Sequence, residues 1–268
     1  MPELPETETI ARDLDAEITG RTIVAAAVTR ADVLREVTPA QLVRRTRGRT
    51  IARAWRRAKL VVIDLDDGER IVVQPRFTGA LPESERRFST LHFDLDDGRR
   101  LHYRDIRRLG TVALMGPARF DEYSATLGIE PLDPELSAER LSVLLRGSRQ
   151  AVKKLLMDQR VIVGIGNIYA NEALWRAGID PSREARSLAR EEVDRLHDGI
   201  VSVLSESIEA RGTSFRDYRD ASGGKGGFVE MLAVYGRGGL PCPRCDARLV
   251  ETHAVDGRTT VFCARCQE

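Results

Sequence analysis

The sequence predicts an α+β protein with a β-rich N-terminal half, a helical second half and a small metal-binding segment at its C-terminal end. Short strand-like runs separated by turns fill the region from residue 22 to about residue 115. Helical periodicity follows after residue 136, and all four cysteines fall within the last 27 residues. A chain of 268 residues exceeds what one hydrophobic core usually supports, so at least two domains are expected.

A helix is expected directly after the first residues. Ile10, Leu14 and Ile18 recur every four positions in a polar background, and a glycine follows two residues later as a stop signal. The strand-like runs come next, at residues 23–28, 60–65, 70–73, 91–95, 100–104 and 111–114. Asp-Leu-Asp-Asp-Gly occurs between runs at 64–68 and again at 94–98, and Asp-Gly between strands indicates an antiparallel hairpin. We therefore predict an antiparallel β-sandwich, with a barrel as the alternative.

The second half of the chain is expected to be helical. Residues 128–134, with two prolines and a glycine, break the strand pattern, and helices are expected after them at 137–146, 149–158, 167–177 and 189–211. Residues 212–228 are polar and rich in glycine, and a loop of this length in a compact domain is usually functional or disordered. The predicted organisation is a helix and sandwich domain at 1–127, a linker at 128–136, a helical domain with that loop at 137–233, and a ribbon at 234–268.

Charge and hydropathy exclude some classes of protein. No apolar run approaches the ~20 residues that a membrane helix needs, and the first ten residues lack the basic and apolar segments of a secretion signal, so a cytoplasmic protein is expected. Of the 42 basic residues only four are lysine, an excess of arginine that a GC-rich genome would also produce. More informative is the segment 44–59, which holds eight basic residues and no acidic one. Such an unmixed stripe indicates a polyanionic partner.

The four cysteines have the spacing of a metal site. Cys242 and Cys245 form one Cys-x2-Cys pair, Cys263 and Cys266 form another, and 17 residues separate the two pairs. They provide four thiolates for one tetrahedral zinc ion, whereas disulfides or redox cysteines are the weaker alternative in a cytosolic protein. Because the chain itself supplies four ligands, no coordination position stays open for water or substrate. The zinc is therefore expected to be structural.

The N-terminus is a candidate nucleophile. Removal of Met1 would leave Pro2 as a free secondary amine next to Glu3. An α-amine has a reference pKa near ~8 and is partly neutral at physiological pH, whereas a lysine side chain near ~10.4 is almost wholly protonated. Such an amine attacks a sugar C1′ to form an iminium while a neighbouring acid protonates the ring oxygen. The turn at 164–167 is a candidate for a different role, the binding of phosphate. Asn167 is expected to cap the helix that follows, and the N-terminus of a helix attracts phosphate.

Five segments together resemble one known family. They are Pro-Glu-Leu-Pro-Glu at 2–6, Arg-Ala-Lys at 57–59, the helix-turn segment at 156–170, Val-Tyr-Gly-Arg at 234–237 and the four-cysteine ribbon. Their residues, and their order along nearly the whole chain, are similar to those of the formamidopyrimidine-DNA glycosylase (Fpg/Nei) family. The resemblance implies a bifunctional base-excision repair enzyme. Such an enzyme flips a damaged base out of duplex DNA, cleaves its glycosidic bond and breaks the strand by β,δ-elimination.

The resemblance also implies catalytic roles for individual residues. Pro2 would be the Schiff-base nucleophile, and Glu3 would be the acid acting at the deoxyribose. Lys59 and Arg258 would contact phosphates and assist elimination. Glu6 would support the N-terminal helix and the site.

Further residues would bind the DNA around the flipped nucleotide. Lys153 and Asn167, in a helix-two-turn-helix element, would hold its phosphates. The loop at 212–228, which contains Lys225, would cover the lesion.

The sequence departs from the purine-specific branch of the family at the residues that fill the gap left by the flipped base. Phe77 stands where a methionine is expected, and Leu109 stands where a phenylalanine is usual, while Arg107 is kept. Gln74 and Thr90 each stand where relatives often have histidine. Apolar wedges of several kinds separate base steps, so Phe77 and Leu109 are expected to do the same. The departures leave the preferred lesion and the opposite-base preference open.

The leading hypothesis is a glycosylase and lyase for oxidised purines such as 8-oxoguanine and formamidopyrimidines. The alternatives are a family enzyme for oxidised pyrimidines or bulkier lesions, and a non-catalytic protein that binds damaged DNA. The expected partner is damaged double-stranded DNA, and the expected state is a monomer in the cytoplasm, associated with the nucleoid. One structural zinc and no organic cofactor are expected.

Overall fold

The computed structural model describes residues 2–74, 77–78, 89–104, 110–213 and 226–268. These residues form two compact units, the first within 1–125 and 211–226 and the second within 126–210 and 227–268. The start of the segment 212–228 therefore belongs to the first unit, although the sequence analysis placed the whole segment with the helical domain. No helix in the described part of the chain is long and apolar enough to cross a membrane.

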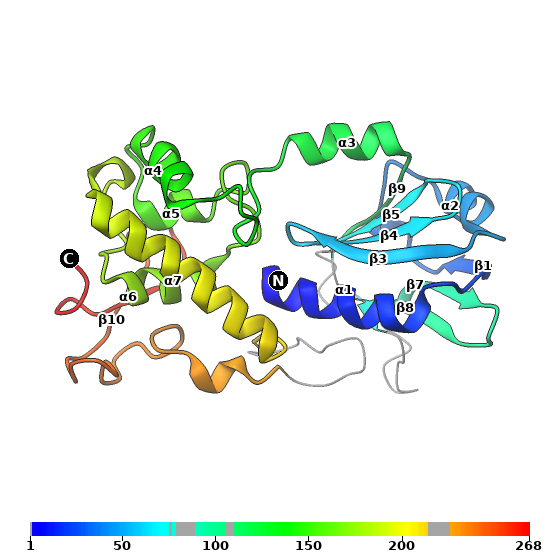
Figure 1. The fold of residues 1–268 in the computed structure, drawn as a ribbon. Coiled ribbons are helices and arrows are strands. Elements are labelled where there is room, and N and C mark those ends of the chain that lie inside the picture. The colour runs from blue at the N-terminus through cyan, green and yellow to red at the C-terminus, as the bar shows by residue number, and fades with distance from the viewer. Residues whose placement is uncertain (1, 75–76, 79–88, 105–109, 214–225) are drawn as a thin grey trace. The chain divides into compact units, whose positions relative to one another are not determined.

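The first unit contains two β-sheets (Figure 1). The larger sheet has the strand order β2-β9-β5-β4-β3, and the smaller has the order β1-β7-β8-β6. The described strand pairs of both sheets are antiparallel except β2 with β9. Side chains from both sheets share one buried core, which confirms the predicted antiparallel sandwich. The strands are β1 (Ile23–Val28), β2 (Leu34–Arg35), β3 (Ile51–Arg57), β4 (Leu60–Leu65), β5 (Arg70–Val73), β6 (Phe77–Thr78), β7 (Ser89–Leu95), β8 (Arg100–Arg104) and β9 (Val112–Met115).

Both Asp-Asp-Gly turns form the predicted hairpins. β4 pairs with β5 and β7 pairs with β8, each in antiparallel register. Gly68 and Gly98 have φ angles of 83° and 82°, a left-handed conformation that glycine adopts without a steric penalty. Alternation along β7 then places Leu91, Phe93 and Leu95 in the core.

Helix α1 (Leu4–Ile18) forms as predicted and lies along β3 (Figure 1). Ile10 and Leu14 on its apolar face are at most 1% exposed. Gly20 follows the helix with a φ of 81°, and its N–H donates to a carbonyl of β3. The helix therefore places its first turn, and the residues before it, at a defined position on the sandwich.

The longer elements of the first unit that were not predicted are β3, α2 (Pro39–Thr46) and α3 (Pro117–Ala125). β3 is an edge strand, and edge strands tolerate charged residues such as Arg53 and Arg56, which hide the apolar alternation. α2 has only 8 residues, and its start depends on the side chain of Thr38, which accepts a hydrogen bond from the Gln41 N–H. Elements this short or this charged give little periodic signal.

The second unit contains the predicted helices and the predicted C-terminal hairpin. Gly199 of α7 allows close packing on α6, because a Cβ at that position would lie 2.9 Å from the carbonyl oxygen of Ala173. The predicted helix at 149–158 is shorter in the structure, where α5 has five residues. The elements are α4 (Ala138–Arg146), α5 (Val152–Leu156), α6 (Asn167–Ala177), the 3-10 helix η3 (Ala185–Ser187), α7 (Arg190–Glu209), the 3-10 helix η4 (Phe228–Met231), β10 (Val250–Thr252) and β11 (Thr260–Phe262).

Helix α6 fixes the chain that leads into the ribbon. The Glu172 carboxylate is 0% exposed and accepts hydrogen bonds from the backbone N–H groups of Ala233, Val234 and Tyr235, at 2.8–2.9 Å. Burial raises the pKa of Glu172, and the three N–H bonds oppose that shift. Asn171 accepts a further bond from the Val261 N–H at 2.8 Å. The ribbon is thus attached to α6 through side-chain bonds to its backbone.

We expect Glu172→Ala to lower the free energy of unfolding by about 2–4 kcal/mol, because buried N–H groups would lose their acceptor. Urea denaturation followed by circular dichroism measures this change. Glu209→Ala, at an exposed position of α7, is the matched control and should change stability by less than about 0.5 kcal/mol. Equal losses in the two variants would contradict the anchoring role of Glu172.

Candidate functional site

The residues next to the N-terminus are held by one buried carboxylate. Glu3 is 6% exposed and directly precedes α1, and its backbone N–H donates to Glu6 Oε2 at 2.8 Å. Glu6 is 2% exposed, and its Oε1 accepts from the Thr213 N–H at 2.7 Å. Glu6 therefore joins the residue beside Pro2 to the start of the segment 212–228. Pro2 itself is half-buried.

Two glycines bring the ends of that segment together beside Glu6. Gly212 has a φ of 81°, and a Cβ there would lie 3.0 Å from Glu6 Cγ. A Cβ on Gly226 would lie 2.2 Å from the carbonyl oxygen of Gly212. Position 226 needs glycine because backbone approaches backbone too closely for a side chain, whereas position 212 favours glycine because of its left-handed φ and the nearby Glu6 side chain. The chain between them, with Lys225, lies outside the described residues.

Lys59 lies in the turn between β3 and β4. The preceding residue, Ala58, has a φ of 55°, in the left-handed region that favours glycine, and it is 3% exposed. Arg56 donates to Glu8 of α1 at 2.9 Å and to the carbonyl oxygen of Ala58 at 3.0 Å. This arginine therefore ties the lysine-bearing turn to the same helix that carries Glu6.

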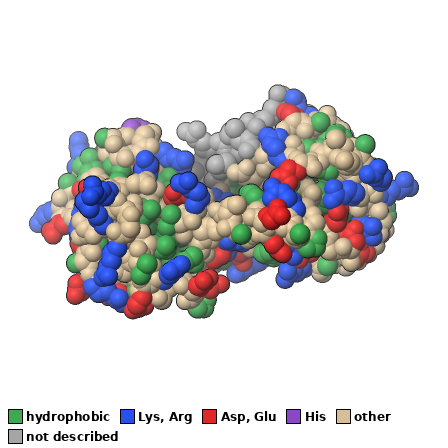
Figure 2. Space-filling model, turned by 90° about the horizontal axis from the view of Figure 1, so that it is seen from above, with side chains coloured by type: hydrophobic (Ala, Val, Ile, Leu, Met, Phe, Trp, Pro, Cys, Tyr) green, Lys and Arg blue, Asp and Glu red, His purple; other side chains and the backbone are tan. Residues whose placement is uncertain are grey.

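The basic segment 44–59, which contains no acidic residue, is not unmixed in space. Four of its arginines form described ion pairs with carboxylates from outside the segment. On the face in Figure 2, basic and acidic side chains are interspersed. Hairpin pairing brings acidic residues next to the stripe, which a local window of sequence does not detect. The ion pairs are Arg45 with Glu69, Arg49 with Asp67, Arg53 with Asp64 and Arg56 with Glu8.

The second unit brings Lys153, Asn167 and the β10–β11 turn together. Lys153 is 0% exposed, and its Nζ donates to Asp256 Oδ1, to the Thr259 carbonyl and to Thr260 Oγ1, at 3.3, 3.3 and 2.8 Å. A fully buried ammonium is not open to solvent for the direct phosphate contact that the resemblance implies. It is directed instead to the turn that carries Arg258.

Asn167 has a different role from the predicted helix cap. α6 begins at Asn167 itself, with Gly166 as its N-cap residue and no capping side chain. The Asn167 side-chain amide donates to the Thr259 carbonyl at 2.9 Å. Arg258, which neighbours Thr259, is exposed.

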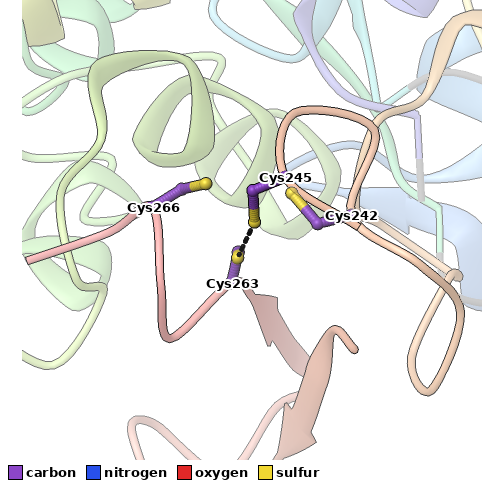
Figure 3. A group of neighbouring side chains, drawn as sticks. All are labelled: Cys242, Cys245, Cys263 and Cys266. Carbon is purple, nitrogen blue, oxygen red and sulfur yellow. Dashed lines mark hydrogen bonds between the residues drawn. The ribbon is translucent and has the colours of Figure 1, made fainter. Parts of the chain in front are cut away.

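The cysteines form the predicted metal centre. Their four Sγ atoms lie within 4.8 Å of one another, and Cys245 Sγ lies 3.5 Å from Cys263 Sγ (Figure 3). Four Zn–S bonds of about 2.3 Å in a tetrahedron place sulfur atoms about 3.8 Å apart, so the cluster fits zinc. Cys242 and Cys245 come before β10, while Cys263 and Cys266 follow β11. Zinc held here closes the base of the hairpin opposite Arg258.

The residues expected to fill the gap in the DNA are only partly described. β6 pairs Phe77 with Tyr103 through the backbone, but the Phe77 side chain lies outside the described residues, as do Arg107 and Leu109. The Tyr103 hydroxyl donates to the Gln74 carbonyl at 3.4 Å, so that contact does not involve the Gln74 side chain. Thr90 is 3% exposed and belongs to the interior.

Thr213, Arg56 and Asp256 were not among the predicted site residues. Each contacts a candidate residue or its turn from a distant part of the chain. Thr213, for example, lies 207 positions from Glu6, and Asp256 lies 103 positions from Lys153. The rarity of lysine was a signal for Lys153, but it did not identify the partner.

Known proteins match the chain along its length. Family models match for the formamidopyrimidine-DNA glycosylase N-terminal domain at residues 1–112, for its H2TH domain at 127–219, and for a zinc finger found in FPG and IleRS at 239–268. The formamidopyrimidine-DNA glycosylase of Heliobacterium modesticaldum is 42% identical over 100% of both chains, and that of Carboxydothermus hydrogenoformans is 40% identical over 100% of both. The chain belongs to the formamidopyrimidine-DNA glycosylase family.

Solved structures agree with this assignment. The MutM (FPG) protein from Thermus thermophilus is 35% identical, with a TM-score of 0.88 over 99% of this chain and 98% of that one. A Lactococcus lactis FPG mutant in complex with Fapy-dG-containing DNA is 31% identical, with a TM-score of 0.91 over 100% of both. The predictions of an α+β fold, an enzyme of this family and a zinc-binding segment are confirmed.

We expect Cys263→Ser to lose the zinc, because three thiolates and a hydroxyl hold the ion far less tightly than four thiolates. Elemental analysis of the purified protein should give about one zinc per chain for the wild type and far less for the variant. Ala264→Ser adds a hydroxyl at an exposed neighbouring position and should keep the metal. A full zinc content in Cys263→Ser would refute the assigned ligand set.

Proposed function

We propose that this protein is a bifunctional DNA glycosylase and AP lyase of base-excision repair that removes oxidised purines. The observation that carries the proposal is the buried Glu6 carboxylate, which fixes Glu3 beside Pro2 and the start of the segment 212–228 beside both. A binding protein would have no use for an N-terminal imine former held in this way. The relatives support a DNA substrate, since Lactococcus lactis Fpg has been solved with Fapy-dG-containing and abasic-site DNA.

Pro2 is the nucleophile in this proposal. After removal of Met1, the neutral amine attacks C1′ of the damaged nucleotide, a C–N bond forms, and the glycosidic bond breaks as the base leaves. Glu3 protonates the deoxyribose ring oxygen, so the ring opens and the product is an iminium. Loss of a C2′ proton then expels the 3′ phosphate, and a second elimination expels the 5′ phosphate. Hydrolysis of the remaining Schiff base returns the free proline.

Positive side chains hold the phosphates of the DNA. Lys59 acts from the β3–β4 turn, and Arg258 acts from the exposed turn of the zinc ribbon. Asn167 supports that turn, and Lys225 belongs to the loop that covers the lesion. The protein acts as a monomer on damaged duplex DNA in the cytoplasm, in contact with the nucleoid. Its zinc is structural.

Phe77, Arg107 and Leu109 fill the gap that the flipped base leaves. A phenylalanine is stiffer than the methionine usual at its position, so it restricts which opposite base is accepted. These same departures favour one alternative, a family enzyme for oxidised pyrimidines or bulkier lesions. In both cases the chemistry at Pro2 and Glu3 is the same, and only the recognised base differs.

We expect borohydride to trap the untagged, methionine-processed protein covalently on a duplex with 8-oxoguanine opposite cytosine, because borohydride reduces the iminium to a stable amine. Pro2→Gly should lose this product and release base at least about a hundredfold more slowly, in line with the loss of a catalytic group. Pro117→Gly, at the exposed start of α3, is the control and should behave as wild type.

The panel also includes duplexes with an oxidised pyrimidine, an abasic site or no lesion. Trapping on the oxidised pyrimidine in place of 8-oxoguanine would support the alternative specificity. Wild-type excision by Pro2→Gly would refute the nucleophile, and no trapping on any duplex would refute the proposed function.

A further inference from the structure

A buried ion pair connects α5 to the zinc ribbon. The ammonium of Lys153 is 0% exposed, the carboxylate of Asp256 is 6% exposed, and Nζ lies 3.3 Å from Oδ1. The same ammonium donates to Thr259 and Thr260 on the other side of the turn. Removing two ions from water costs free energy that only well-placed partners offset. An ion pair this buried therefore indicates that the turn it contacts must have a defined conformation.

That geometry concerns the backbone of Arg258. Asp256 Oδ1, the oxygen that meets Lys153, also accepts the Arg258 N–H at 3.0 Å. On the far side, Asn167 donates to the Thr259 carbonyl at 2.9 Å. The turn is thus held immediately before and immediately after Arg258, while the Arg258 side chain stays exposed.

We propose that Asp256 and Lys153 are positioning residues for the phosphate contact of Arg258. The ion pair fixes the backbone at 256–260 before DNA binds, so Arg258 reaches its phosphate without first ordering the turn. Lys153 then acts on DNA through Arg258 and makes no phosphate contact of its own. This inference rests on the proposed function, which gives Arg258 its phosphate.

A merely structural role predicts something different. If the pair only stabilised the second unit, its loss would weaken DNA binding whether or not Arg258 were present. If the pair acts through Arg258, its loss should have no further effect once Arg258 has been removed. A double-mutant cycle separates the two cases.

The test uses the full-length, zinc-loaded protein and a labelled duplex with a tetrahydrofuran abasic analogue, which binds but is not cleaved. Fluorescence anisotropy gives the affinities of the wild type, Asp256→Asn, Arg258→Gln and the double variant. We expect Asp256→Asn to weaken binding about three- to tenfold, and to change it less than about twofold in the Arg258→Gln background. Asp198→Asn, whose carboxylate is 85% exposed, is the matched control and should bind as wild type.

Two further readouts exclude a loss of folding. Asp256→Asn should keep its zinc, and its amide hydrogen exchange should rise at 254–260 but not in α6. Arg258→Gln should reduce the slope of log affinity against log salt by about 0.9, the value for one phosphate contact. If Asp256→Asn does not fold, Lys153→Met with Asp256→Ala removes both charges and leaves no unpaired buried ion. This double substitution should weaken DNA binding to the same extent, and it should have little further effect once Arg258 has been replaced.

Additive losses in the double variant, or unchanged exchange at 254–260, would overturn the positioning role while leaving the proposed function intact. A wild-type protein that does not prefer the tetrahydrofuran duplex over undamaged duplex would overturn the proposed function, and the DNA role of Asp256 with it.

Discussion

The positions of the N-terminus and of residue 213 in the first unit depend on the carboxylate of Glu6. It accepts one backbone N–H from Glu3 and one from Thr213, at 2.8 and 2.7 Å, in an interior where neither donor has water as an alternative. Each charge-assisted bond contributes roughly 1.5–3 kcal/mol, and removing the acceptor would leave two buried donors unsatisfied. One side chain thus sets the position of the N-terminus and of the loop base together. The position of Pro2, which neighbours Glu3, therefore depends on this carboxylate.

In the second unit, too, buried polar side chains form hydrogen bonds with the backbone of a distant segment. Its ribbon has two strands of three residues each, too little structure to be stable alone. Side chains of α5 and α6 therefore satisfy its backbone groups: Lys153, Asn167 and Asn171 at the hairpin, and Glu172 at the chain that leads into it. Zinc closes the other end. The turn between β10 and β11 lies between these fixed points, and its Arg258 side chain is exposed to solvent.

Elements with local causes were predictable from the sequence. The apolar spacing of α1 and the Asp-Gly turns at Gly68 and Gly98 are signals contained within a few consecutive residues. The spacing of the cysteines likewise predicts the metal site. β3 was missed because its arginines depend on partners brought in by strand pairing. For the candidate site, the residues themselves indicated Pro2 and Glu3, and the resemblance supplied Lys59 and the supporting role of Glu6. Neither predicted the contacts with Thr213 and Arg56, which come from distant parts of the chain or from the folded turn. Asn167 was predicted to cap α6, but α6 begins at Asn167 itself. Its side-chain amide donates to the Thr259 carbonyl on a distant hairpin, a contact that the local sequence does not indicate.

The choice of lysine at position 153 follows from its surroundings. This chain uses arginine almost everywhere, with only four lysines among 42 basic residues. At position 153 three acceptors of the turn at 256–260 lie 2.8–3.3 Å from one nitrogen. A compact ammonium with three donors matches that arrangement, whereas the planar fork of a guanidinium presents its donors in one plane and needs more room. Geometry therefore overrides the preference of the chain for arginine at this position, as expected where a side chain organises a turn rather than covers a surface.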